Sequence, residues 1–207
     1  MPGLNLYTSN RLEVLAEKLA KVLSNPLSSP LQGEIVVVQS KGMERWVSME
    51  LARHHGICAN FQFPFPNHFV HSTFREIIPD VQEESPFDPE IMTWKVIKAL
   101  PNNLKKKGFE SLRNYLSEEV ADLKLFQLSQ RVADLFDQYL LFRPDMVLGW
   151  EEGEENHWQA ILWREVVKGN EKKHRAALQK IFLEAIKKPG IKLETLPERI
   201  AVFGISV

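Results

Sequence analysis

Four consecutive apolar residues, Ile35-Val-Val-Val38, constrain the fold of this chain more than any other segment. A strand with one solvated face alternates apolar and polar side chains, whereas an unbroken β-branched run is typical of a strand buried on both faces. Such strands belong to parallel sheets, in which neighbouring strands are joined by helical crossovers. Residues 42–53 follow with a helical pattern, and its apolar face is made by Met43, Trp46, Val47 and Leu51.

The segment before this strand predicts the same architecture. Leu4-Asn-Leu-Tyr7 alternates apolar and polar residues, which favours a first strand. An amphipathic helix is expected next, and Asn10 with Glu13 has the spacing of a capping box. Its apolar face is formed by Leu12, Leu15, Leu19, Val22 and Leu23. The first 55 or so residues therefore indicate an α/β fold.

From Pro64 onward the pattern becomes helical, with prolines between the segments. The expected helices cover residues 67–77, 88–100, 109–116, 122–142, 158–167 and 174–186. A final strand is expected at 200–203. It lies in the apolar segment at residues 199–207, from which we expect a buried strand and infer that the chain is a piece of a longer protein. We predict an α/β domain at 1–79 plus 191–207 and a mostly helical insertion at 80–190. This order resembles the first domain of a P-loop helicase with its inserted subdomain.

The residues that ATP hydrolysis requires are missing from this helicase-like pattern. A P-loop has glycines and a Gly-Lys pair after the first strand, but Tyr7 to Arg11 contains neither. Ser9 or Asn10 is expected to cap the following helix instead, although weak phosphate contact near Arg11 stays open. The last strand ends at Phe203 with no acidic residue after it. We predict an inactivated helicase-like domain with no catalytic site and no cofactor.

Composition excludes several other classes of protein. Lys plus Arg is 26 and Asp plus Glu is 27, so a uniformly basic DNA-coating protein is not expected. The single cysteine, Cys58, excludes an internal disulfide, and no signal peptide or membrane span is recognisable. We therefore expect a cytoplasmic protein without membrane association. His54, His55 and Cys58 lack a second ligand pair, so no metal is expected, and residues 151–155 are interpreted as a solvated loop.

Several segments together resemble the RecC family, the gamma chain of exodeoxyribonuclease V. They occur in the family's order and extend over nearly the whole chain. The segments are Tyr7-Thr-Ser-Asn-Arg-Leu12, Val38-Gln-Ser-Lys-Gly-Met-Glu-Arg-Trp46, Gly56-Ile-Cys-Ala-Asn-Phe-Gln-Phe-Pro-Phe-Pro66, Leu125-Phe-Gln-Leu-Ser129, Ala133-Asp-Leu-Phe-Asp-Gln-Tyr-Leu140, Arg143-Pro-Asp145 and Phe203-Gly-Ile-Ser206.

The resemblance implies a non-catalytic DNA-binding subunit of a RecBCD-type helicase–nuclease. Its partners would be RecB-like and RecD-like motor subunits and single-stranded or forked DNA. Its role would be to guide one strand and to help recognise the Chi sequence during double-strand break repair by homologous recombination. Two other classes stay open: an autonomous ATP-dependent helicase or nucleotide-binding enzyme, and a protein-interaction scaffold that does not touch DNA.

The first candidate DNA contacts lie near the sheet. Gln39, Lys41 and Arg45 follow the end of a core strand, where open α/β sheets bind ligands. The resemblance places them, together with Phe65 and His71, in the family's Chi-reading channel. Lys41 and Arg45 stand where the best-known member has Thr and Gln, and His71 stands in place of a Trp, so a different sequence preference is expected. Solvated surface is the alternative for the polar residues.

The second group of candidates lies on or near the long helix at 122–142. Asp134 belongs to a polar stripe, Asp137 lies beside it, and their carboxylates can accept hydrogen bonds from base amino groups or orient Arg143. The resemblance implies that this helix lines the recognition channel, so Leu135 is included. Arg175 is a further candidate for strand contact. The alternative is a solvated helix face with salt bridges.

Overall fold

A computed structural model describes residues 3–29, 31–117, 121–188 and 196–204. The chain divides into two compact units. The sheet unit comprises residues 1–76 and 192–207, and the helical unit comprises residues 77–191. The identity of these units with two helicase subdomains stays a prediction.

The sheet unit is built on three parallel strands. Strand β1 (Glu34–Val37) lies between β2 (Phe61–Gln62) and β3 (Ile200–Val202). In the register, Ile35 pairs with both Gln62 and Ile200. Val36 and Val38 are fully buried and Val37 nearly so, as the β-branched run predicts. The strand that returns after the helical unit thus completes the sheet that the first 62 residues begin.

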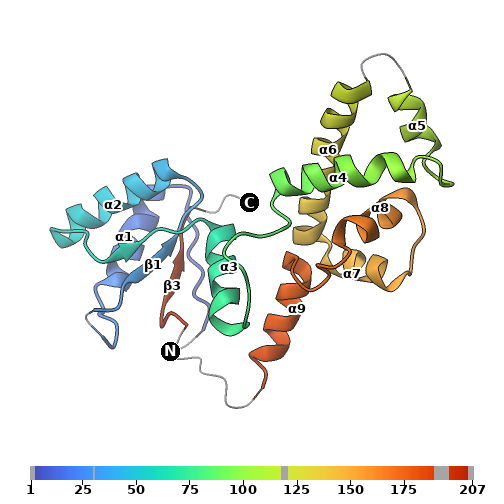
Figure 1. Cartoon of the computed structure of the whole chain (residues 1–207). Coiled ribbons are helices and arrows are strands. Elements are labelled where there is room, and N and C mark those ends of the chain that lie inside the picture. The colour runs from blue at the N-terminus through green and yellow to red at the C-terminus, as the bar shows by residue number, and fades with distance from the viewer. Residues whose placement is uncertain (1–2, 30, 118–120, 189–195, 205–207) are drawn as a thin grey trace. The chain divides into compact units, whose positions relative to one another are not determined.

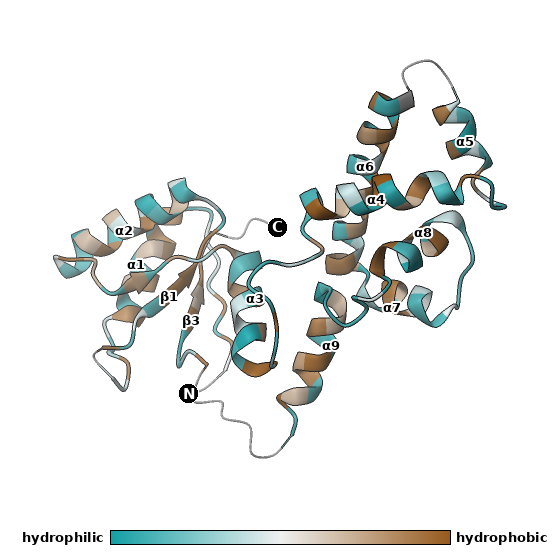
Figure 2. Ribbon diagram, viewed as in Figure 1, coloured by the Kyte–Doolittle hydropathy of each residue, from teal (hydrophilic) through white to brown (hydrophobic). Residues whose placement is uncertain are grey.

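Helices α1 (Leu12–Leu23) and α2 (Lys41–His55) pack against each other and contribute to the core of this sheet. The core contains Ala16 and Ala20 of α1, Val47 and Leu51 of α2, and Phe203 just after β3. Figure 2 shows β1 and β3 in brown, while the helices alternate between brown and teal. The helical pattern at 42–53 is therefore confirmed, and the apolar face of α1 is confirmed in part, because Leu15, Leu19 and Leu23 pack in this core whereas Leu12 is 43% exposed.

Arg199 connects three elements of the sheet unit. Its Nε donates to Glu34 Oε2 at 3.1 Å, and its Nη2 also pairs with Glu34 Oε1. Nη1 donates to Val22 O at 3.0 Å, and Nη2 donates to Asn25 O at 2.8 Å. The guanidinium thus donates to two carbonyl groups at the end of α1 while it binds the first residue of β1.

Three predictions for this unit are wrong. Residues 4–7 do not form a strand, and Leu4 and Leu6 are 95% and 82% exposed, so the short alternation reflects no buried face. The capping box does not form, because α1 has Arg11 as its N-cap without a side-chain cap, while Ser9 Oγ accepts from the Arg11 backbone N–H instead. The final strand is not buried, because β3 is an edge strand and exposes half of Val202.

The helical unit contains the helices that follow α3. Helix α3 (Pro66–Ile77) leads from β2 to the unit boundary. The unit itself is formed by α4 (Pro89–Asn103), α5 (Glu110–Leu116), α6 (Ala121–Phe142), α7 (Pro144–Glu152), α8 (Trp158–Val167) and α9 (Arg175–Ala185). Figure 1 shows α4 crossing α6, with α7 and α8 beside them. Helix α7 is absent from the sequence-based prediction, because Pro144 marks its first turn rather than a loop.

A buried polar group lies inside the aromatic core of the helical unit. His174 is fully buried, and its Nε2 lies 2.8 Å from Glu151 Oε1, which also accepts a 2.9 Å hydrogen bond from Trp163 Nε1. His174 Nδ1 accepts from Ala177 N at 3.2 Å and so caps α9. The interpretation of residues 151–155 as a solvated loop is therefore wrong at Glu151. This residue lies inside helix α7, and its carboxylate binds core residues.

No helix in the described parts of the chain combines the length and the apolar composition that a bilayer crossing requires. The fold class is α/β, mostly helical, with a small parallel sheet.

Candidate nucleic-acid interface

The carboxyl edge of the sheet brings Lys41 and Phe65 together. Val38 N donates to Pro64 O at 3.1 Å, so the chain segments after β1 and β2 leave the sheet side by side. Lys41 Nζ lies 5.5 Å from the centroid of the Phe65 ring, a distance at which a cation and an aromatic face attract. The sequence places these residues on separate elements, and parallel pairing of the two strands unites them.

The start of α2 supplies further polar groups at this edge. Ser40 Oγ accepts from Met43 N at 3.1 Å and begins the helix. Lys41 pairs with Glu44 at 2.8 Å, one turn along the helix. Arg45 lies four residues after Lys41, hence on the same helix face, and is exposed like Gln39. Lys41 thus lies over an aromatic ring that is 38% exposed, and Gln39 and Arg45 are exposed positions close to it in the sequence.

Other aromatic residues near this edge serve the core. Phe61 and Phe63 stack with ring centroids 6.1 Å apart and pack against the buried cluster of the sheet unit. Phe61 and Phe63 are therefore packing residues of the sheet unit. His71 is half-buried on α3, six residues beyond Phe65.

In the helical unit, folding brings Asp137 of α6 and Arg175 of α9 together. Burial raises the pKa of Asp137, the Arg175 guanidinium lowers it, and the nearby Asp134 and Asp88 raise it further. Burial lowers the pKa of Arg175, and Asp137 opposes that effect. This half-buried carboxylate and its neighbouring guanidinium, with exposed Asp134 beside them, form the densest group of candidate residues in the unit.

Two other candidate residues of the helical unit, Arg143 and Leu135, are not part of this group. Arg143 is exposed and is the N-cap residue of α7, and its side chain makes no hydrogen bond or ion pair within the described residues. The sequence suggested that Asp137 orients Arg143, but the cation whose charge acts on Asp137 is Arg175. Leu135 is half-buried on α6, next to the core residue Phe136.

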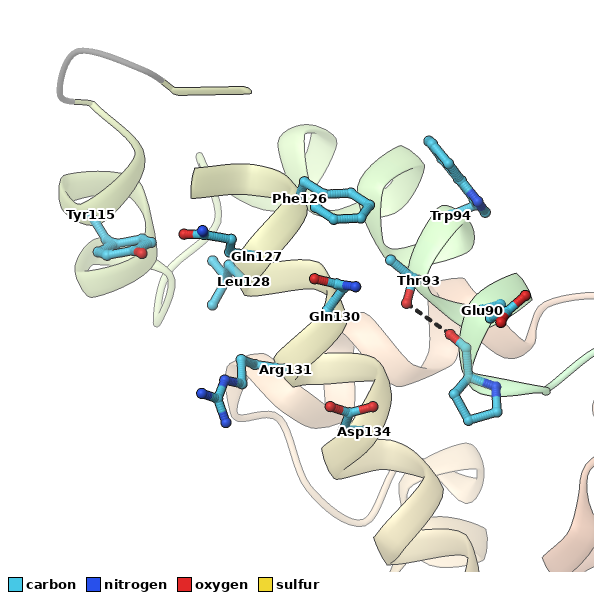
Figure 3. A pocket seen from close by; sticks show the side chains of 11 residues that line it. Glu90, Thr93, Trp94, Tyr115, Phe126, Gln127, Leu128, Gln130, Arg131 and Asp134 are labelled. Carbon is cyan, nitrogen blue, oxygen red and sulfur yellow. Dashed lines mark hydrogen bonds between the residues drawn. The ribbon is translucent and has the colours of Figure 1, made fainter. Parts of the chain in front are cut away.

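A hollow of about 910 Å³ on the helical unit escaped the sequence analysis. It lies among α4, α5 and α6, and Trp94 and Phe126 are neighbours at one end of it, with their rings tilted by 55° (Figure 3). The one residue of the sequence-based list that lines it is Asp134. A detectable signal existed, because Trp94 falls outside the α4 stripe formed by Met92, Val96 and Leu100. A tryptophan on the polar face of a helix indicates an interaction surface.

His55 and Cys58 are engaged in structural contacts. His55 Nε2 lies 3.0 Å from Ala20 O near the end of α1. Burial raises the pKa of the Cys58 thiol, and a hydrogen bond with Ser48 partly opposes this shift. Over the described ranges, no group of three or more His, Cys, Asp or Glu side chains is arranged to hold a metal ion.

Comparison with known proteins identifies the class. The family model described as RecC, N-terminal domain, matches residues 4–207, so the chain belongs to this family, as its motifs predicted. RecBCD enzyme subunit RecC of Escherichia coli (strain K12) is 38% identical over 216 residues, covering 98% of this chain and 19% of that protein. The subunit of the same name from Haemophilus influenzae (strain ATCC 51907 / DSM 11121 / KW20 / Rd) is 37% identical over 235 residues, covering 97% and 21%. The chain spans about a fifth of the length of these curated relatives.

Proposed function

We propose that this chain is the N-terminal part of a non-catalytic, DNA-binding subunit of a RecBCD-type helicase–nuclease. It acts in double-strand break repair by homologous recombination. It guides single-stranded DNA and takes part in reading a Chi-like sequence, and its partners are RecB-like and RecD-like motor subunits. Membership of the RecC family over residues 4–207 supports the assignment of the complex.

The observation that carries the DNA-guiding role is the contact between Lys41 and Phe65. A cation beside a partly exposed ring offers an unpaired nucleotide both of its ordinary contacts, a phosphate partner and a stacking surface. Gln39 and Arg45 add groups that can hydrogen-bond base edges or phosphate. These four residues lie just after the strands β1 and β2, where ligands of open α/β sheets bind.

Two features support a helicase-like domain that does not hydrolyse ATP: the topology of the sheet and the segment before α1. A parallel sheet that is interrupted by a helical unit and completed by a returning strand fits a helicase-like first domain. The segment before α1 has neither the glycines nor the lysine of a phosphate-binding loop, and the α1 N-cap is an arginine. A passive strand guide is therefore favoured over an ATP-driven enzyme.

The test compares two substitutions on helix α2 in the complex assembled with both motor chains. Lys41→Ala removes the cation at the first helical turn, and Arg53→Ala removes one in the last turn, about 18 Å away at 1.5 Å per residue. We expect Lys41→Ala to weaken binding of a forked oligonucleotide and to lower the slope of log affinity against log salt by roughly one. The Arg53→Ala complex should bind like the parent.

If the two variants bound the forked oligonucleotide with equal affinity and equal salt dependence, the DNA-guiding role of this edge would be contradicted and the scaffold alternative would be favoured. A separate titration of the full subunit with Mg²⁺ and ATP, without motor chains, addresses the remaining class. Tight magnesium-dependent binding in that titration would establish a nucleotide-binding enzyme and would contradict the proposal.

A further inference from the structure

The hollow on the helical unit has the composition of a protein-docking surface. Its aromatic side chains come from three different helices: Trp94 of α4, Tyr115 of α5 and Phe126 of α6. Trp94 is 66% exposed, and its ring centroid lies 6.3 Å from that of Phe126. Exposed clusters of large aromatic side chains mark interaction sites, and Trp and Tyr are the residues most enriched at binding hot spots.

The apolar surface continues beyond the hollow. Ile91 precedes Trp94 by three residues, and Leu123 precedes Phe126 by three, so each lies on the same helix face as an aromatic residue of the hollow. Both are large apolar side chains that remain exposed. A small molecule held in the hollow would leave them in water, whereas a polypeptide segment laid across α4 and α6 would cover them.

The polar groups of the hollow select the charge of its occupant. Glu90 and Asp134 supply two carboxylates against the single guanidinium of Arg131. In the part of the chain that the structure describes, none of these three side chains has a hydrogen bond or an ion pair. Carboxylates repel a phosphate backbone but attract ammonium and guanidinium groups. The lining residues thus carry one net negative charge, and the further cation Lys124 lies over Tyr115. The side of the hollow with Trp94 and Glu90 in Figure 3 therefore favours a cation over a phosphate backbone.

The aromatic rings favour the same kind of ligand, because a cation above a ring face is attracted by the π-electrons. One ring already has such a partner, since Lys124 Nζ lies 5.3 Å from the centroid of the Tyr115 ring. Among the described residues, no lysine or arginine lies over the ring of Trp94 or Phe126, which are neighbours in Figure 3. A guanidinium entering there would meet two rings, with the carboxylates of Glu90 and Asp134 also lining the hollow.

We propose that this hollow docks a segment of another polypeptide, which places an arginine or lysine side chain against the exposed surfaces of Trp94 and Phe126 and an apolar side chain over Ile91 and Leu123. The inference concerns the helical unit alone and does not depend on the DNA-guiding role of the sheet edge. The carboxamide groups of Gln127 and Gln130, which also line the hollow, are available to hydrogen-bond the backbone of the docked segment.

The test is a titration of the isotopically labelled chain followed by nuclear magnetic resonance. The probes are a capped tripeptide of arginine, leucine and arginine, the same peptide with glutamate in place of arginine, and a short oligothymidylate. We expect the cationic peptide alone to shift the Trp94 indole and Gln127 side-chain signals. Its affinity should fall about tenfold on Trp94→Ala, read at Gln127, and by at least as much in the Glu90→Gln, Asp134→Asn double variant.

Phe142→Ala is the matched control, because Phe142 is 71% exposed at the other end of α6 and does not line the hollow. Its response to the cationic peptide should equal that of the parent, and the spectra of all variants report whether each is folded. Shifts of the same signals by oligothymidylate to an equal extent would show a base-stacking platform and overturn the proposal. Equal binding of the acidic peptide, or no shift with any probe, would also overturn it.

Discussion

Replacing Arg199 by alanine should destabilise the sheet unit far more than an ordinary surface substitution. The arginine is 21% exposed and its partner Glu34 13%, so neither charge is well solvated. Truncation leaves the Glu34 carboxylate without its cation and removes the donors to Val22 O and Asn25 O. Breaking a buried pair costs about 3 to 5 kcal/mol, and the partial exposure here reduces the expected loss to roughly 2 to 4 kcal/mol.

Amide hydrogen exchange of β1 measures this loss, because residues 36–38 lie in the centre of the sheet and report on that unit alone. With a urea m-value of about 1 to 3 kcal/mol per molar, the unfolding midpoint of the unit should fall by roughly 1 to 2 M. Arg199→Lys keeps the charge but loses the fork geometry and should recover part of the stability.

Arg11→Ala is the control, because Arg11 and its partner Glu13 are both well exposed, at 70% and 65%. Its substitution should change the stability by less than about 1 kcal/mol. If Arg199→Ala were no more costly than this control, the view of Arg199 as the residue that ties α1, β1 and β3 together would be refuted.

Three further outcomes are expected. Burial raises the pKa of Asp137, so the native carboxyl binds its proton more tightly than the unfolded one, and the free energy of unfolding falls as pH rises from about 3.9 through the raised pKa. The urea midpoint of Asp137→Asn, relative to that of the parent, should therefore increase over that pH window. A difference that does not change with pH would contradict this. His174→Ala should cost about 2 to 4 kcal/mol of the helical unit's stability in urea unfolding, whereas His174→Asn, which can still cap Ala177 N, should cost less; equal losses would rule out the capping contribution. Glu44→Gln frees Lys41 from its ion pair and should tighten oligonucleotide binding about twofold in an anisotropy titration at low salt, and unchanged affinity would argue against DNA contact by Lys41.

Local sequence determined the elements whose signals are periodic and long. The run Ile35–Val38 specified a buried central strand because β-branched residues on both faces leave few other ways to remove them from water. The extent of α8 follows directly from the sequence, residues 158–167 in both the expectation and the structure. The strand predicted at residues 4–7 does not form, because two apolar residues in alternation do not distinguish a strand from an exposed extended segment.

The tertiary structure decided every pairing of residues distant in the sequence. Lys41 meets Phe65 because two strands run parallel, and Asp137 meets Arg175 because α9 returns to α6. Arg199 binds Glu34, 165 positions earlier, although neither residue lies in a recognisable motif. Periodicity identifies which face of an element is apolar, but it contains no information about which other element that face will meet. The buried central strand, the helices other than α7 and family membership were therefore available from sequence, whereas the charge pairs and the aromatic hollow required the fold.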